Sequence, residues 1–244
     1  MNNFTLVDHS NPKIEMFEQN GTKSTKAALN KYYKSEVKIK EAIRETGRSG
    51  LDIPASKVIP KVPYGECFQN WEGPLNYAVD MDQISTAEYW HLKDTQPSFI
   101  VKEGLGNLVA TLNNNFPIVQ NTTVHKIDYS GTAIKVVTSK GTITARGCIC
   151  TVSIGVLKSE KIKFFPTLSS NVQKALDGIQ MGLLIKIPLL FDGSRLGFTE
   201  NSFLQYDIEP EDIGSGCYFL AWPTGHDYIV GFIGGQFALS LIHI

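Results

Sequence analysis

Apolar and polar residues follow a helical pattern over residues 24–47. Apolar side chains form a single stripe, with lysines and glutamates between them. This spacing predicts a surface helix with one buried face. Ser24 is the expected N-cap, and Gly47 is expected to end the helix in a left-handed turn. The stripe consists of Leu29, Tyr32, Tyr33, Val37, Ala42 and Ile43.

Three further segments favour helices. Leu105, Leu108, Val109 and Leu112 fall at i, i+3, i+4 and i+7, which predicts a helix that stops before residues 113–117. The stretch SSNVQKALDGIQMG predicts a second helix, with Ser170 or Asn171 as its cap and Gly182 as its end. The aromatic stretch YGECFQNWEGPLNYAV is expected to form a short helix that breaks at Gly73-Pro74.

Strand-like runs occupy much of the rest of the chain. TVHKIDYS, AIKVVTSK and TITARGCICTV are separated by Ser130-Gly131 and Lys140-Gly141, which predicts a meander of three strands. Cys148 and Cys150 alternate in the third run and are expected to be small core residues on one strand face. Further strands are expected in GCYFLAWP and DYIVGFIGG. Helices and strands mix without regular β–α alternation, so the predicted fold class is α+β.

Composition narrows the function. The chain has 244 residues, is 42% hydrophobic and carries a net charge of −1, which is typical of a globular protein and gives no reason to expect nucleic acid or anionic lipid as a partner. No apolar run approaches the ~20 residues of a membrane-spanning helix, and the N-terminus lacks the apolar run of a signal peptide. The four cysteines show no metal-binding spacing, so no metal is expected, and the default expectation is reduced thiols in the cytoplasm.

Lys186 interrupts the apolar segment MGLLIKIPLLF. In a strand it would share a face with Leu184, Pro188 and Leu190, and Pro188 indicates an edge strand or a bulge. A buried ammonium is costly unless it is paired or deprotonated. The residues alone leave two interpretations open: a lysine that extends to water from a strand end, or a lysine held inside for chemistry.

Three stretches together resemble the flavin-containing amine oxidases, the family of monoamine oxidases, polyamine oxidases and lysine-specific histone demethylases. The first is EGLGNLVATL, like the family's glycine-rich turn and helix. The second runs from IVQNTTVHKIDYS through CTVSIGVLKSEKIKFFPTLSS to MGLLIKI, and the third is GHDYIVGFIGGQFALSL. The resemblance covers residues ~99–241 best, and its motifs agree in order.

The resemblance implies the fold of a two-domain flavin oxidase, present in part. Residues 1–98 would be the first, helical part of a substrate-binding domain. Residues 99–157 would be a portion of the FAD-binding domain with its β-meander, and residues 158–244 the second part of the substrate domain, with a mixed sheet. The family binds FAD through an N-terminal G-x-G-x-x-G unit, and this sequence contains no such motif. The chain is therefore expected to be the central part of a longer flavoenzyme, as a fragment or as one product of a split gene.

Two residues acquire roles through the resemblance. Lys186 matches the family lysine that holds a water against flavin N5. Val124 matches the valine whose backbone N–H and C=O bind the adenine of FAD, although by its side chain it is an ordinary β core residue. Ser153 stands where the family usually has proline, so no role is assigned to the turn at Thr151-Val152-Ser153.

The implied activity is FAD-dependent oxidation of an amine to an imine or aldehyde, with oxygen as acceptor and hydrogen peroxide as product. The implied partners are a small-molecule amine and oxygen. Two alternatives stay open. The chain is either a non-catalytic fragment or a subunit that needs a partner chain with the nucleotide-binding motif, or it belongs to an amino-acid oxidase or another flavin oxidoreductase of the same superfamily.

Overall fold

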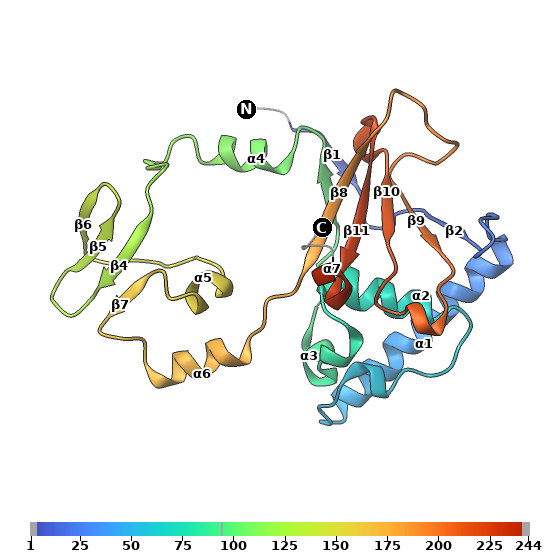
Figure 1. The fold of residues 1–244 in the computed structure, drawn as a ribbon, viewed down its shortest axis with the longest axis horizontal. Coiled ribbons are helices and arrows are strands. Elements are labelled where there is room, and N and C mark those ends of the chain that lie inside the picture. The colour runs from blue at the N-terminus through green and yellow to red at the C-terminus, as the bar shows by residue number, and fades with distance from the viewer. Residues whose placement is uncertain (1–3, 94, 241–244) are drawn as a thin grey trace. The chain divides into compact units, whose positions relative to one another are not determined.

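The computed structural model describes residues 4–93 and 95–240 and forms two compact units (Figure 1). The first unit combines the residues up to Leu112 with those from Gly182 onward, and the second is Asn113–Met181. Leu241, the last residue of the family resemblance, lies outside the described residues. The assignment of these units to a substrate domain and an FAD domain stays a prediction.

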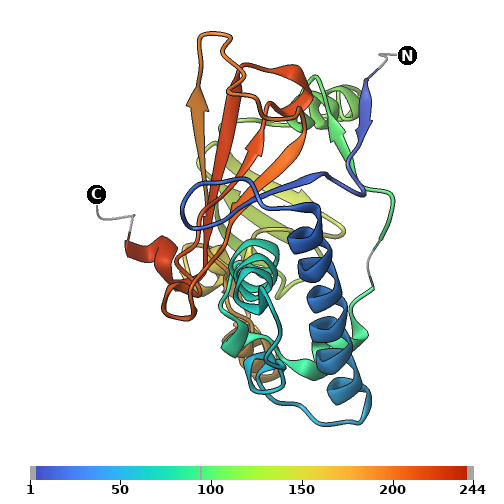
Figure 2. The same cartoon turned by 90° about the vertical axis from the view of Figure 1, so that its right-hand side faces the viewer.

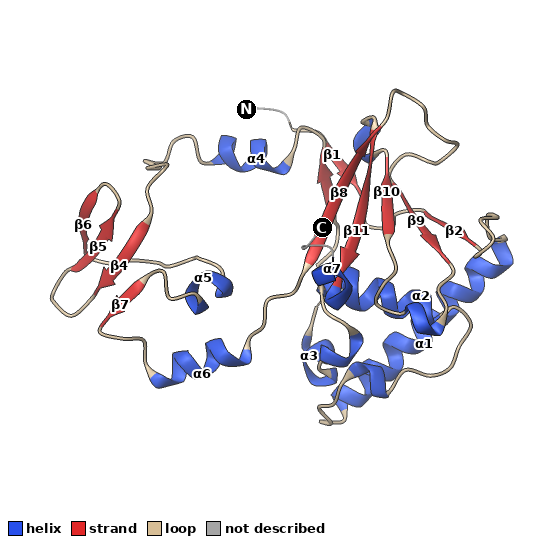
Figure 3. Ribbon diagram, viewed as in Figure 1, coloured by secondary structure: helices blue, strands red, loops and turns tan. Residues whose placement is uncertain are grey.

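A five-stranded mixed sheet is the centre of the first unit (Figure 3). Its order is β2 (Ile14–Phe17), β9 (Ser202–Tyr206), β10 (Tyr218–Ala221), β11 (Tyr228–Gly234) and β8 (Leu184–Leu190). The β2–β9 pair is parallel and the other pairs are antiparallel. β8 is an edge strand, which confirms the prediction from Pro188.

Helices cover one face of this sheet. They are α1 (Lys26–Arg48), α2 (Gly65–Asn70), the π-helical stretch η2 (Trp71–Tyr77) and α3 (Thr86–His91). The main core joins Met16 of β2 and Tyr218 of β10 to Tyr32 and Ile39 of α1 and Phe68 of α2. Smaller elements complete the unit: β1 (Leu6–Asp8) paired with β3 (Phe99–Val101), α4 (Leu105–Leu112), α7 (Gly235–Ser240) and the 3-10 turns Ala55–Lys57, Met81–Gln83, Pro210–Asp212 and Pro223–Gly225.

Both predicted ends of α1 were wrong. Thr25, not Ser24, caps the N-terminus, and its side chain accepts a hydrogen bond from a first-turn amide. Gly47 lies inside the helix, where an added Cβ would come within 2.0 Å of the Thr86 carbonyl oxygen. Its function is therefore close packing against α3, and the left-handed turn falls at Gly50, with φ +84°.

The aromatic helix also continues through the expected break at Gly73-Pro74. Pro74 has no N–H for an α-helical hydrogen bond, and here it lies inside the wider π-helical turn that follows α2. The Pro74 carbonyl packs so closely on β11 that a Cβ at Gly234 would come within 1.6 Å of its oxygen. This irregular stretch thus fixes the distance between the helical layer and the sheet.

The second unit contains the expected meander. Its sheet has the order β6 (Gly141–Ala145), β5 (Ile134–Thr138), β4 (Val124–Asp128) and β7 (Lys163–Phe165), with β7 parallel to β4. Two helices complete it, α5 (Ile154–Lys158) and α6 (Ser170–Gly178). The mixed sheet of the first unit and this meander confirm the α+β prediction.

The third strand of the meander is shorter than predicted. It ends at Ala145, and residues 146–153 form no strand. Cys148 and Cys150 are exposed, and Ile149 between them is 91% exposed. The expectation that both cysteines are core residues was wrong, because this segment has no ladder partner among the described residues.

Helix α6 begins and ends earlier than its sequence suggests. Ser169 is the N-cap, and the helix stops at Gly178. Gly182 has a different function: a Cβ there would lie 2.8 Å from the Ala78 Cβ, and the next residue donates its N–H to the Ala78 carbonyl. Gly182 therefore allows the start of β8 to approach the end of η2.

The helix predicted from the periodicity of residues 105–112 is confirmed as α4. Its apolar stripe is exposed in this structure, with Leu105 and Leu112 each 66% exposed.

None of the helices that the structure describes has both the length and the apolar character needed to cross a membrane.

Candidate functional site

Lys186 lies on the edge strand β8, directly opposite Phe232 of β11. Its Nζ is 5.4 Å from the centre of the Phe232 ring, within the range of a cation–π interaction. The side chain is exposed, and its strand neighbours Ile187 and Leu189 are 40% and 43% exposed. Of the two interpretations that the residues leave open, the exposed side chain on an edge strand agrees with a lysine that extends to water. The role of Lys186 beside a flavin stays a prediction.

An aromatic row extends from Lys186 along the helix-covered face of the sheet. Phe232 lies 6.2 Å from Phe203 of β9, and Phe203 lies 4.8 Å from Trp71, measured between ring centroids. Trp71 also contacts Tyr218, in an edge-to-face arrangement at 5.5 Å. Such contacts favour well-defined ring positions. The row contains residues of β9, β10, β11 and η2. Lys186 places an ammonium at its Phe232 end, and the other end, at Trp71 and Tyr218, is aromatic.

The sequence identified Lys186 but assigned no role to these aromatic residues. Phe203 and Phe232 do follow the strand alternation that places them on one face. What the sequence lacks is the register between β9, β10 and β11, which aligns these rings. Trp71 received no role because aromatic residues are more often part of the core, and its position over the sheet depends on the path of η2.

Buried polar contacts hold the helical layer against the sheet beside this row. The Tyr218 hydroxyl donates to the Cys67 carbonyl at 2.8 Å. The Asn70 side chain accepts from the N–H groups of Gly214 and Gly216 and donates to the Gly216 carbonyl. Burial raises the pKa of the Cys67 thiol to about 12, so this cysteine stays protonated and structural. These contacts fix α2 and thereby the start of η2 that carries Trp71.

Asp80 lies against the junction between β11 and α7. An added Cβ at Gly235, where φ is +65°, would come within 2.3 Å of the Asp80 carboxylate oxygen. Burial raises the pKa of Asp80, although a hydrogen bond to the backbone of Gln236 opposes this effect. Gly234 and Gly235 thus let the end of β11 pass between the Pro74 carbonyl and this carboxylate.

Val124, the second predicted site residue, begins β4 in the second unit. The Ser139 N–H donates to the Thr123 carbonyl at 2.8 Å, and Val124 pairs with Thr138. In an antiparallel ladder this is a non-hydrogen-bonded pair, so the Val124 N–H and C=O face away from β5. On that side the pairing with β7 begins only at Lys126. Val124 therefore presents a backbone donor and acceptor at an unpaired stretch of the strand edge.

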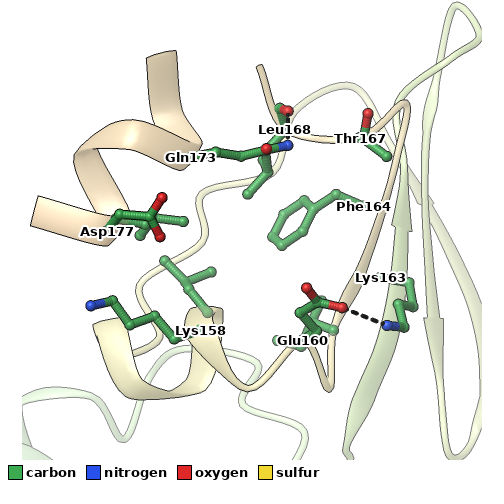
Figure 4. A pocket seen from close by; sticks show the side chains of 11 residues that line it. Lys158, Glu160, Lys163, Phe164, Thr167, Leu168, Gln173 and Asp177 are labelled. Atoms are coloured by element: carbon green, nitrogen blue, oxygen red, sulfur yellow. Dashed lines mark hydrogen bonds and ion pairs between the residues drawn. The ribbon is translucent and has the colours of Figure 1, made fainter. Parts of the chain in front are cut away.

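Two cavities of the described chain lie elsewhere. A cavity of about 590 Å³ opens between α5, β7 and α6, where Phe164 points inward and Lys158, Glu160 and Asp177 surround it (Figure 4). A cavity of about 230 Å³ lies beside Asp80. Neither is lined by Lys186 or Val124. Lys186 belongs to the first unit and Val124 to the second.

Comparison with known protein families decides the assignment. The family model described as flavin containing amine oxidoreductase matches residues 11–240. The chain belongs to this family. The match extends well beyond the ~99–241 range in which the sequence resembles the family best, and it includes α1, α2 and η2.

Curated relatives of this amine oxidoreductase chain include plant proteins of two kinds. It is 36% identical over 137 residues to Protein FLOWERING LOCUS D of Arabidopsis thaliana, which covers 55% of this chain and 17% of that protein. It is 31% identical over 138 residues to Lysine-specific histone demethylase 1 homolog 3 of Oryza sativa subsp. japonica, with the same coverage. It is 27% identical over 262 residues to Polyamine oxidase 4 of Oryza sativa subsp. japonica, which covers 97% of this chain and 51% of that protein.

Solved structures agree on the fold. A double mutant of putrescine oxidase superposes with a TM-score of 0.70 over 99% of this chain and 62% of that chain, at 9% sequence identity. At this identity the match shows the fold alone. The chain spans about half or less of the curated relatives named above.

Membership of the family implies FAD as the cofactor. The described residues fit this group in part. The Val124 N–H and C=O face away from β5 at a position where β7 provides no partner, and an adenine edge requires such a donor and acceptor. Lys186 offers an ammonium beside an aromatic surface. The sequence contains no G-x-G-x-x-G motif for the pyrophosphate.

Proposed function

We propose that this chain works as part of an FAD-dependent amine oxidase that converts an amine to an imine with oxygen as acceptor. The family match over residues 11–240 supports the class of reaction. The placement of Lys186 at the end of an aromatic row supports the position of the reacting centre.

The reaction removes two electrons and two protons from the substrate. The carbon next to nitrogen loses a hydride equivalent, the nitrogen loses a proton, and a C=N bond forms. Water then converts the imine to an aldehyde and ammonia or a smaller amine. Oxygen takes the two electrons and two protons and becomes hydrogen peroxide. When bound, FAD would supply the acceptor for the hydride equivalent and the route by which the electrons reach oxygen.

Lys186 holds a water molecule in this proposal. Its ammonium donates hydrogen bonds, and Phe232 limits the directions in which the side chain extends. A water bound to Nζ is then available for proton transfer when oxygen is reduced. Val124 contributes through its backbone alone, by pairing with the adenine edge.

The aromatic row supplies a low-polarity wall for the substrate. Trp71, Phe203 and Phe232 present ring surfaces that suit the alkyl part of an amine. A surface of this kind favours the neutral amine, which has the nitrogen lone pair that imine formation needs.

Peroxide release from purified, FAD-loaded protein tests this function. The substrates are a polyamine, an aromatic monoamine, an N-methyl-lysine peptide and a free amino acid. Amine-dependent peroxide formation supports the proposal, and its loss without FAD links it to the cofactor. Turnover of the free amino acid alone would replace the proposal by an amino-acid oxidase. Bound FAD without any turnover would contradict the proposed oxidase.

A second candidate is a subunit that works with a partner chain bearing the nucleotide-binding motif. The exposed apolar segment around Ile149 favours it, because such surface is commonly covered by another protein surface. Two measurements on the purified chain with added FAD decide between the candidates: visible flavin absorbance and the rate of thiol labelling at Cys148 and Cys150. Flavin binding by the chain alone contradicts the second candidate. Flavin binding and slower labelling that appear only with a co-expressed partner support it.

A further inference from the structure

Helix α1 carries a concentrated basic face on the outside of the first unit. Figure 2 shows α1 in blue, turned toward the viewer, with its full length visible. Tyr33 and Val37, which are 38% and 54% exposed, lie among exposed lysines in its first two-thirds. We call this set the basic face of α1: Lys26, Lys31, Lys34 and Lys38 together with Tyr33 and Val37.

The charges of this face are unbalanced. None of its four ammonium groups forms an ion pair with any residue that the structure describes. The acid among residues 26–40 is Glu36, and it pairs with Lys40 at 2.7 Å. Glu41 marks the end of the face. The chain as a whole has a net charge of −1, so this positive charge is a local concentration.

The arrangement costs helix stability. Lys31, Lys34 and Lys38 follow one another at i+3 and i+4, and like charges at these spacings destabilise a helix by about 0.2–0.5 kcal/mol per pair. Lys26 stands in the first turn, where no acidic residue is present and where the helix macrodipole disfavours a cation. The stability of α1 therefore does not explain these lysines.

The two apolar side chains indicate which partner fits. Tyr33 and Val37 are four residues apart on one helix face, and the lysine row Lys31, Lys34 and Lys38 runs beside them over ~10 Å. An apolar centre with a charged rim is the usual composition of a protein interface. A phosphate backbone would use the lysines but would leave Tyr33 and Val37 exposed.

We propose that the basic face of α1 binds an acidic, amphipathic segment of another protein. Its carboxylates pair with Lys31, Lys34 and Lys38, and its apolar side chains cover Tyr33 and Val37. This inference does not depend on the oxidase activity, since it involves none of the residues around Lys186 or Val124.

Fluorescence anisotropy with the full chain tests the proposal. The probe is a labelled helical peptide of about 15 residues, ~22 Å long, with Glu and Leu at i+3 and i+4 spacing. Binding is measured at about 50 and about 300 mM NaCl, because screening weakens an electrostatic rim. We expect saturable binding that weakens with salt, and a loss of at least about tenfold in K31E/K34E/K38E.

The matched control is K102E/K161E/K174E, which changes three exposed lysines elsewhere and lowers the net charge by the same amount. This control variant is expected to change the affinity for the peptide by less than about threefold, because salt screens charges that lie far from the bound peptide. Y33S/V37S is expected to weaken binding about fivefold or more. Far-UV circular dichroism verifies folding, and K31Q/K34Q/K38Q replaces the charge reversal if that variant does not fold.

Three results would overturn the proposal. The first is the absence of saturable binding at the lower salt concentration. The second is an equal loss of affinity in the two charge-reversal variants, which would mean that only net charge matters. The third is tighter binding of a DNA duplex of similar length that Y33S/V37S leaves unchanged, which would identify a nucleic-acid surface instead.

Discussion

Lys186 and Phe232 occupy directly opposed positions on β8 and β11, with the ammonium 5.4 Å from the ring centre. An exposed pair of this kind is worth about 0.5–1 kcal/mol, which is enough to bias the lysine side chain toward the aromatic surface. The orientation comes from strand register, because Phe232 projects from the same face of the sheet as Lys186. The site thus combines an exposed ammonium with an aromatic ring on the same face of the sheet.

Changing Lys186 to Met should slow turnover of the FAD-loaded enzyme by about a hundredfold or more, because the hydrogen-bond donor that positions a water is lost. The fold should persist, since Lys186 is exposed at a sheet edge. Stopped-flow absorbance separates flavin reduction from its reoxidation by oxygen. Lys135→Met, another exposed lysine on a strand, is the control and should leave both rates unchanged. Equal rates in wild type and Lys186→Met would remove Lys186 from the mechanism.

Val124 gives a test that separates backbone from side chain. If its N–H and C=O bind adenine, Val124→Ala should keep FAD affinity within about threefold, whereas Val124→Pro should lower it about tenfold or more through the loss of one donor. Proline is tolerated here because the N–H does not belong to the β4–β5 ladder. Titration of FAD monitored by flavin fluorescence measures both. An equal loss in the two variants would assign the effect to side-chain packing.

Local patterns predicted much of this fold. The helix at 105–112, the meander after Val124 and the edge position of Pro188 all follow from neighbours in sequence: helical periodicity, turn residues and the missing N–H of proline. Each depends on interactions within one element or one hairpin, and such interactions are visible in the sequence.

The errors arose where a distant partner determines the structure. The sequence predicts Gly47 as a helix end, but Gly47 lies inside α1, where the neighbouring Thr86 carbonyl leaves no room for a side chain. The sequence predicts a helix break at Pro74, but η2 continues through Pro74, whose carbonyl packs against Gly234. Cys148 reads as a strand residue, but its segment finds no ladder partner in the described chain. Thr86 and Gly234 lie far in sequence from Gly47 and Pro74, and the lack of a ladder partner at Cys148 leaves no local signal.

The candidate site shows the same limit. Lys186 and Val124 were identified through resemblance to a family, because neither residue type is distinctive by itself. The aromatic row that ends at Lys186 depends on the register of three strands and on the path of η2, which no local pattern specifies. Sequence therefore predicted a residue, and the structure added its surroundings.

Gly234 should be the least replaceable glycine of the first unit. A Cβ there would lie 1.6 Å from the Pro74 oxygen, so Gly234→Ala must displace either β11 or η2. We expect a loss of about 3 kcal/mol or more in the free energy of unfolding, at the upper end of overpacking effects. Urea denaturation measures it. Gly106→Ala in α4, where a Cβ meets nothing within 4 Å, should instead gain about 0.5–1 kcal/mol. Equal stability of Gly234→Ala and wild type would mean that η2 is not fixed against the sheet.

The final prediction concerns Glu15, a buried carboxylate on β2. Its oxygens accept hydrogen bonds from the Thr199 N–H at 2.8 Å, from the Ser202 hydroxyl at 3.2 Å and from Lys23. Burial alone would raise the pKa, but the hydrogen bonds from Lys23 and Thr199 outweigh it and lower the pKa of Glu15 to about 2. The charged form is therefore the one that stabilises the fold.

Because the folded pKa lies below the value of 4.5 for an unperturbed glutamate, this stabilisation is present above pH 4.5 and is lost as the pH falls toward about 2. Glu15→Gln should lower the free energy of unfolding by about 2–3 kcal/mol at pH 7. The difference from wild type should shrink steadily as the pH falls from 4.5 to 2. Urea titrations across this range measure the difference, with the exposed Glu211→Gln as control. A difference that does not vary with pH would show that Glu15 acts through packing rather than charge.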